Sequence, residues 1–427
     1  MNNHGNADKN WGNVQLVEFS GASEKPKVLL IATLDTKPTE TAYLRDCLEG
    51  QGIQVIHLDP SIRRTVAGAE ITPDMIAAAA GTNMQAVRDL RHEGKSQAVM
   101  MEGAQKLAHE IDAREGLSGI LAIGGSMGTT LATSVMRSFP YGLPKVMIST
   151  MASGFTTPFV GTREIVMGNA VCDIAGLNTI TRDVYRNGAL AVAGMAKGYR
   201  RPEKSARPLV LMGTLGTTER CSVMVRSALE REGIEVMVFH TTGSGGQTLD
   251  QIVRERDVTA VIELSLVEMM DFLHGGLCSG GPDRARAELQ KGVPTIFVPG
   301  NCDFVIAGPI EDAHARFPGK RYHIHNAALT AVRTEAVELG HLAKHLGELI
   351  GEAKGPVSIY VPLQGFSSHD SPEGHLHDLS MPPVFVKQIT AAVAGRVPVH
   401  TLDVHVNTQA FADALVQQVL TYIHKEA

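Results

Sequence analysis

The sequence predicts an α/β protein of two lobes related by internal duplication, each lobe a parallel sheet with helices on both faces. The chain has 427 residues, of which 44% are hydrophobic, and this length suits two or three globular domains. Short β-branched runs alternate with amphipathic stretches, which is typical of a parallel sheet covered by helices. The pattern of residues 25–59 also returns at 206–240.

The two repeats align without a gap. Each repeat has the pattern of a buried strand ending in Thr-Leu, a small polar turn, a helix, then Gly-Ile and a second strand. The two segments are KPKVLLIATLDTKPTETAYLRDCLEGQGIQVIHLD and ARPLVLMGTLGTTERCSVMVRSALEREGIEVMVFH. Further strand and helix pairs follow in both halves. We therefore expect two Rossmann-like lobes with parallel sheets, and ligands beyond the carboxyl ends of the strands.

Composition suggests the boundaries of the lobes. Residues 1–24 are polar and rich in Gly and Asn, so we expect a flexible N-terminal tail. The N-terminal lobe is predicted at 25–200 and the C-terminal lobe at 206–427, joined by a Gly-, Pro- and Lys/Arg-containing linker around 194–208. Amphipathic helices late in the chain are expected to cover the second sheet, although the sequence leaves the lobe of the last helix open.

Charge and cysteine usage argue against several classes of protein. The formal net charge is −6 and no basic block occurs, which argues against nucleic-acid binding. The five cysteines lie far apart without a CxxC pair, so neither a zinc ribbon nor a disulfide framework is predicted, and a cytoplasmic location is expected. No apolar run approaches the ~20 residues of a membrane helix, so no membrane association is expected.

The first candidate phosphate site is the loop GGSMGTT at 124–130. Gly124, Gly125 and Gly128 would let backbone amides approach an anion, with Ser126 and Thr129 near the start of the following helix. The loop is neither a Walker loop nor a GxGxxG fingerprint. A structural glycine turn is the alternative.

Two other strand ends of the first lobe carry polar residues. In TLDTKPTE, Lys37 could contact a phosphate as a point charge and Asp35 could hold Mg²⁺ through water, with Thr33 as a further candidate for the phosphate site. Ser149, in the loop STMASG after another strand, is a candidate for the same site. The alternative for TLDTKPTE is turn chemistry before a helix, with Pro38 near its first position.

In the second lobe, FHTTGSGGQ provides a further glycine loop. His240, Gly243, Gly245 and Gly246 would line the wall opposite the first loop, so that a ligand lies between the lobes. Glu263, at the end of AVIEL, is a candidate base. A strand-end His with only a packing role is the alternative for His240.

The segment RYHIHNAALTAVRT (321–334) combines several chemically active side chains. His323 and His325 alternate and would share a face of a strand, whereas Thr330 and Arg333 would share a face of a helix that Asn326 caps. His325 would then be an acid or base, and Arg333 a phosphate or carboxylate clamp.

The loop GFSSHDSPEGHLHD (365–378) is rich in His and carboxylates. Such a cluster could bind a divalent metal, but it lacks the HExxH spacing, so a solvated loop is favoured and no metal site is predicted.

Seven motifs in order resemble the Tm-1-like, or UPF0261, family: TLDTKPTE, GGSMGT, STMASG, DIAGLN, FHTTGSGG, PGNCDF and HIHNAALTAVRT. The resemblance implies two Rossmann-like lobes, an ATP-binding site and homodimerisation. Plant members carry an additional TIM barrel that resembles phosphoenolpyruvate mutases, so a separate barrel protein is an implied partner. The His-rich loop departs from the family pattern, which puts a uniform chemistry in doubt.

Three functional hypotheses remain. In the first, the chain binds a ligand between the lobes and acts in small-molecule catabolism. The ligand would be ATP or a related nucleotide with Mg²⁺, or another phosphorylated small molecule. In the second, the chain is a regulatory module that recruits a TIM-barrel partner. In the third, it is a metal-dependent sugar-acid enzyme that uses the His-rich loop. No set of residues demonstrates chemistry, so whether the protein is an enzyme is left open.

Overall fold

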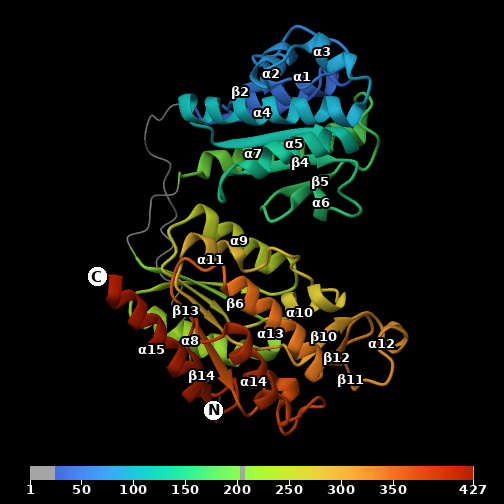
Figure 1. Cartoon of the computed structure of the whole chain (residues 1–427). Helices are drawn as coiled ribbons and strands as arrows, with labels where there is room; N and C mark the ends of the chain where they lie inside the picture. The colour runs from blue at the N-terminus through green and yellow to red at the C-terminus, as the bar shows by residue number, and fades with distance from the viewer. Residues whose placement is uncertain (1–24, 202–206, 427) are drawn as a thin grey trace, which may run out of the picture. The chain divides into compact units, whose positions relative to one another are not determined.

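The computed structural model describes residues 25–201 and 207–426, which divide into two compact units (Figure 1). Unit 1 comprises 25–159 and 165–200, and unit 2 comprises 160–164, 201 and 207–426. The predicted tail, 1–24, and residues 202–206 of the predicted linker lie outside the described residues. Within the described ranges, no helix is long and apolar enough to cross a membrane.

Unit 1 alternates strands and helices along the chain. Its elements are β1 (Lys27–Ile31), α1 (Pro38–Glu49), β2 (Gln54–Leu58), α2 (Pro73–Ala79), α3 (Met84–Asp89), α4 (Glu93–Glu115), β3 (Gly119–Gly124), α5 (Ser126–Ser138), β4 (Lys145–Ser149), α6 (Thr157–Val160), β5 (Val166–Asn169) and α7 (Thr179–Gly198).

The strands of unit 1 form a parallel sheet in the order β2-β1-β3-β4-β5. Every residue of β3 and β4 is buried, because helices cover both faces of the sheet. These strands therefore lack the alternation of buried and exposed residues that a sheet with one solvent-facing side shows. Side chains of α2, α3, α4 and α5 pack on one face, and those of α1 and α7 on the other. The predicted α/β class with a parallel sheet is confirmed for this lobe.

Unit 2 begins with the same alternation and then adds elements. They are β6 (Leu209–Thr214), η1 (Gly216–Thr218), α8 (Glu219–Arg231), β7 (Glu235–His240), α9 (Ser244–Glu255), β8 (Ala260–Glu263), α10 (Val267–His274), α11 (Arg286–Lys291), β9 (Thr295–Phe297), β10 (Phe304–Ala307), α12 (Ile310–Arg316), β11 (Tyr322–Ile324), β12 (Thr330–Arg333), α13 (Ala336–Ile350), β13 (Val357–Pro362), η2 (Ser368–Asp370), α14 (Met381–Val393), β14 (Val399–Leu402) and α15 (Gln409–Glu426).

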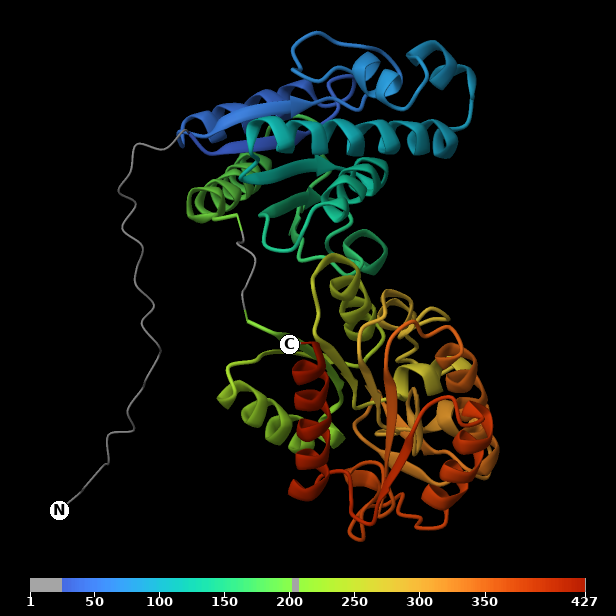
Figure 2. The ribbon, with the colours of Figure 1, turned by 60° about the vertical axis from the view of Figure 1, so that its left-hand side comes forward.

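The main sheet of unit 2 is parallel in the order β14-β13-β9-β8-β6-β7. Numbered from β6, this is the winding of unit 1 with one more strand, so the repeated sequence pattern corresponds to a repeated topology. Helices α10, α11, α13 and α14 cover one face. The last helix, α15, packs beside α8 on the other face and belongs to unit 2 (Figure 2).

A separate antiparallel sheet, β10-β12-β11, is inserted between β9 and α13. The prediction of a helix that carries Thr330 and Arg333 is wrong, because both residues lie in strand β12. Alternating Thr330 and Val332 suit a strand that is paired on both edges. Asn326 does not cap a helix: its Oδ1 accepts the backbone N–H groups of Ala328 and Leu329 in the turn between β11 and β12. The helix begins later, at Ala336.

Candidate functional sites

The strand order of unit 1 reverses beside β1, where β2 leads one way and β3 the other. In open parallel sheets this switch point opens a crevice at the carboxyl ends of the strands, where ligands bind. A cavity of about 480 Å³ lies there, within the size range of small-molecule sites. The loops after β1, β2 and β3 and the residues around the start of α4 line it.

Most residues predicted to bind phosphate in the first lobe line this cavity. Those from the loop after β1 are Thr33, Asp35 and Lys37, and those from the loop after β3 are Gly124, Gly125, Ser126 and Gly128. The two loops are 90 residues apart in sequence but follow neighbouring strands, which is why the sheet brings them together.

The glycines of the first loop have different roles. A Cβ on Gly124 would lie 2.8 Å from the Cα of Gly128, so Gly124 is needed for the tight turn. Gly125 and Gly128 have ordinary contact distances of 3.8 and 3.6 Å for an added Cβ. Gly125 is the N-cap of α5, and no side chain caps this helix within the described residues. The first turn of α5 therefore presents its amides toward the cavity.

The charge of the cavity is predominantly positive. Four cationic side chains and two carboxylates line it, namely Lys37, Arg63, Arg88 and Arg91 against Asp35 and Glu93. None of the three arginines was among the residues predicted from the sequence to contact a ligand. Arg63 lies in the loop after β2, so a basic residue in a loop after a strand was the available signal. Arg88 and Arg91 reach the cavity through the packing of α3 and α4.

Two predicted residues of the first lobe do not line the cavity. Thr129 and Ser149 are fully buried, and their hydroxyl oxygens lie 2.6 Å apart in a hydrogen bond. Thr129 Oγ1 also donates to the carbonyl of Gly125. These contacts tie the start of α5 to the end of β4, which holds the glycine loop in position.

The glycine loop of unit 2 already has an anion at its amides. Glu268 Oε1 accepts the backbone N–H groups of Gly243, at 2.6 Å, and Gly246, at 3.0 Å. A Cβ on Gly245 would overlap the carbonyl oxygen of His240, whose own side chain is exposed. This loop therefore packs against an internal carboxylate, at the position where a phosphate was predicted.

The candidate base Glu263 lies in a buried ion-pair cluster around Arg284. Arg284 contacts Glu263 and Glu268 at 2.7 Å each and Asp250 at 3.2 Å, and all four side chains are buried. Burial raises the pKa of Glu263 and Asp250, and raises that of Glu288 well above its usual range. The structure thus places Glu263 in the interior, with Arg284 as its partner.

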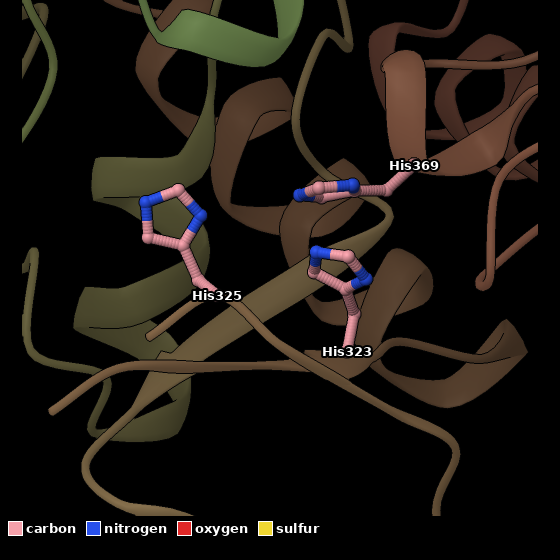
Figure 3. A group of neighbouring side chains, drawn as sticks. All are labelled: His323, His325 and His369. Carbon is pink, nitrogen blue, oxygen red and sulfur yellow. The ribbon is translucent and has the colours of Figure 1, made fainter. Parts of the chain in front are cut away.

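Three histidines of unit 2 converge although the chain separates them. His323 and His325 come from β11 and the residue after it, and His369 comes from η2 (Figure 3). One ring nitrogen from each of the three lies within 4.8 Å of the other two. The rings of His323 and His369 have centroids 4.0 Å apart, and His375 Nδ1 lies 3.0 Å from His323 Nδ1. Burial lowers the pKa of His323, and lowers that of His369 to about 4.

Arg333 lies at the other end of the same antiparallel sheet. The register pairs His323 with Ala331, and His325 N–H donates to the carbonyl of Leu329, so Arg333 lies about 13 Å along β12 from the residue opposite His325. Arg333 is buried beside Asp370, at 3.4 Å, and Asp303, at 3.8 Å. Burial raises the pKa of Asp303 to about 7. His325 and Arg333, which the sequence predicted as acid or base and as anion clamp within one segment, thus lie in two separate clusters.

Both units of the chain are similar in sequence to known proteins. Residues 26–201 and 207–423 match the N-terminal and C-terminal domains of a family described as an uncharacterised protein family (UPF0261). A UPF0261 protein of Clostridium tetani is 31% identical over 404 residues, 93% of this chain and 99% of that protein. A UPF0261 protein of Mesorhizobium japonicum is 31% identical over 391 residues, 91% and 97% of the two chains. The ToMV resistance protein Tm-1 of Solanum lycopersicum is 29% identical over 423 residues, 93% of this chain but 56% of that protein. With both family domains matched along nearly its whole length, the chain belongs to the UPF0261 family.

Proposed function

We propose that unit 1 binds a phosphate-bearing small molecule, such as ATP or a related nucleotide, in the cavity beside β1 and β3. One observation carries the proposal: the uncapped first turn of α5 and four cationic side chains line one cavity of about 480 Å³. Helix amides and guanidinium groups both favour phosphate oxygens, and burial in a cavity strengthens the attraction.

The details of the lining support a phosphate. Arg91 has a left-handed backbone, with φ of 44°, a conformation that is costly for a non-glycine residue and is concentrated at functional sites. Asp35 Oδ2 accepts the N–H of Arg63 and so holds the loops after β1 and β2 together. A Mg²⁺ carried by a nucleotide would meet Asp35 on this side of the cavity.

Thermal unfolding of the whole chain with ATP, ADP, inorganic phosphate and phosphoenolpyruvate, each with and without Mg²⁺, tests the proposal. A ligand at a hundred times its dissociation constant stabilises the folded state by roughly 2.7 kcal/mol. The variant Gly125→Asp places a carboxylate at an N-cap with extended backbone and room for a Cβ. It should fold at least as stably as the parent, because Asp caps helices well, and yet lose the ligand-induced shift.

Gly154→Asp is the matched control, since it adds the same charge at an exposed position with no atom within 4 Å of the new Cβ. It should keep the shift. If no phosphate-bearing ligand raises the midpoint, or if Gly125→Asp keeps the full shift, this cavity is not the phosphate site.

A further inference from the structure

We propose that His323, His325 and His369 bind one divalent transition-metal ion, such as Zn²⁺, leaving a coordination position open to solvent. The three rings reach one point from two different segments, and their ring nitrogens already lie within 4.8 Å of one another (Figure 3). A tetrahedral ion bound at ~2.0–2.1 Å requires nitrogens about 3.3 Å apart. Modest side-chain rotations close that difference.

The backbone holds the three residues in place. His323 lies on β11 opposite Ala331 of β12, and His325, two residues on, shares its face. On the other side, Ser367 Oγ accepts the N–H of His369, and the Phe304 and His369 rings meet in a tilted, edge-type contact with centroids 5.6 Å apart.

The next residue, Asp370, fastens the same loop from within. It is fully buried, and its carboxylate accepts the backbone N–H groups of Phe366 and Asp378. A site on a paired strand and a fastened loop keeps its ligands within reach of one ion.

The hydrogen bonding of these rings differs from that of histidines with a structural role. His57 Nε2 lies 2.8 Å from the carbonyl of Ala32, and His405 Nε2 lies 2.9 Å from that of Ser367. By contrast, the ring nitrogens of His325 and His369 make no hydrogen bond within residues 25–201 and 207–426. Two imidazoles without hydrogen-bond partners, grouped with His323, whose Nδ1 contacts only another imidazole, that of His375, are suited to share a cation.

The surroundings determine which ion fits. All three ligands are imidazole nitrogens, which suit Zn²⁺, Ni²⁺, Co²⁺ and Cu²⁺ better than Mg²⁺ or Ca²⁺. His375 Nδ1, 3.0 Å from His323 Nδ1, is placed to orient the His323 ring from outside the coordination shell. His325 is exposed, so water or an oxygen of a small ligand can reach the fourth position, as in zinc sites with three protein ligands.

Metal titration of the whole chain after treatment with EDTA tests this proposal. We expect one equivalent of Zn²⁺ per chain by calorimetry, and with Co²⁺ the visible absorption of a tetrahedral site. His325→Ala and His369→Gln should each lower the affinity by more than the ~10–100-fold that loss of an orienting residue costs, and His375→Ala should fall within that range.

His240→Ala is the control, because His240 is exposed in the same unit and lies outside the cluster. It should bind Zn²⁺ like the parent. Thermal midpoints measured with EDTA separate loss of the site from loss of folding, and His325→Ala, at an exposed position, should match the parent there. Absence of stoichiometric Zn²⁺ or Co²⁺ binding, or equal affinity in His325→Ala and the parent, would overturn the proposal.

Discussion

Glu268 Oε1 accepts the backbone N–H of Gly246 at 3.0 Å, at the beginning of helix α9. The same oxygen accepts the N–H of Gly243, and the other carboxylate oxygen pairs with Arg284. In unit 1 the glycine loop at Gly125 opens onto a cavity with cationic side chains. Two glycine loops that look alike in sequence therefore differ in their partners, one internal and one available to a ligand.

Gly246→Ala should destabilise unit 2 severely. The added Cβ would overlap Glu268 Oε2 and Arg284 Nε, and both groups belong to a buried ion pair that has no room to move. We expect a loss of about 3–5 kcal/mol in the free energy of unfolding, as for a broken buried pair. Gly194→Ala, on the exposed side of α7 with open space around the new Cβ, should instead stabilise by up to ~1 kcal/mol. Urea unfolding gives the free energy of unfolding of each variant. Similar changes in the two variants would contradict this account.

Two glutamates of the Arg284 cluster should lose different amounts of stability on the same change. Glu288 is fully buried, and burial raises its pKa well above its usual range, which favours the protonated acid, so we expect Glu288→Gln to cost about 1 kcal/mol or less. Glu268 accepts from two amides and from Arg284, so Glu268→Gln should cost about 3–5 kcal/mol. Chemical denaturation gives both values. Equal losses would show that Glu288 is charged in the native state.

Asp271 should make unit 2 less stable as the pH rises. Burial raises its pKa from 3.8 to about 7, although its carboxylate accepts the N–H groups of Ile306 and Cys278. The native state then holds a proton that the unfolded state has released, so the free energy of unfolding falls between about pH 4 and pH 7 and levels above. One such proton changes it by ~1.4 kcal/mol per pH unit.

Asp271→Asn isolates this contribution. The variant loses one of the two hydrogen bonds at every pH, but its stability relative to the parent should improve from pH 5 to pH 7 and stay constant above. Urea unfolding at several pH values gives the difference. A parent and variant with parallel pH profiles would mean that Asp271 titrates normally.

Arg91→Gln should weaken phosphate-ligand binding in unit 1 about tenfold, since one charge-assisted contact contributes ~1.5 kcal/mol or more. Arg91 lines the cavity and is exposed to it. Arg114→Gln removes the same charge from a surface residue of unit 1 paired with Glu115, outside the cavity lining. The affinity of the Arg114→Gln variant for the phosphate ligand should equal that of the parent. Calorimetric titration compares them, and equal weakening in both variants would indicate a general field effect instead of a local contact.

By itself, the sequence determined the two parallel α/β lobes, because alternating buried strands and amphipathic helices are a local pattern that the repeat displays twice. It also determined that the loops after β1 and β3 carry small and polar residues. The carboxyl ends of parallel strands lie at one edge of the sheet, so the loops at Thr33 and Gly124 could be expected to lie at the same edge.

Only the tertiary structure decided which of these residues face a cavity and which are internal. Glu268, in the first turn of α10, accepts the amide of Gly243 because the fold places the start of α10 beside the start of α9. Thr129 and Ser149 bond to each other because β4 lies beside β3. The helix expected at Arg333 became a strand because β10 and β11 pair with it on both sides, a long-range contact that local propensity does not report. The meeting of His369 with His323 has the same cause, since 46 residues separate partners that only packing brings together.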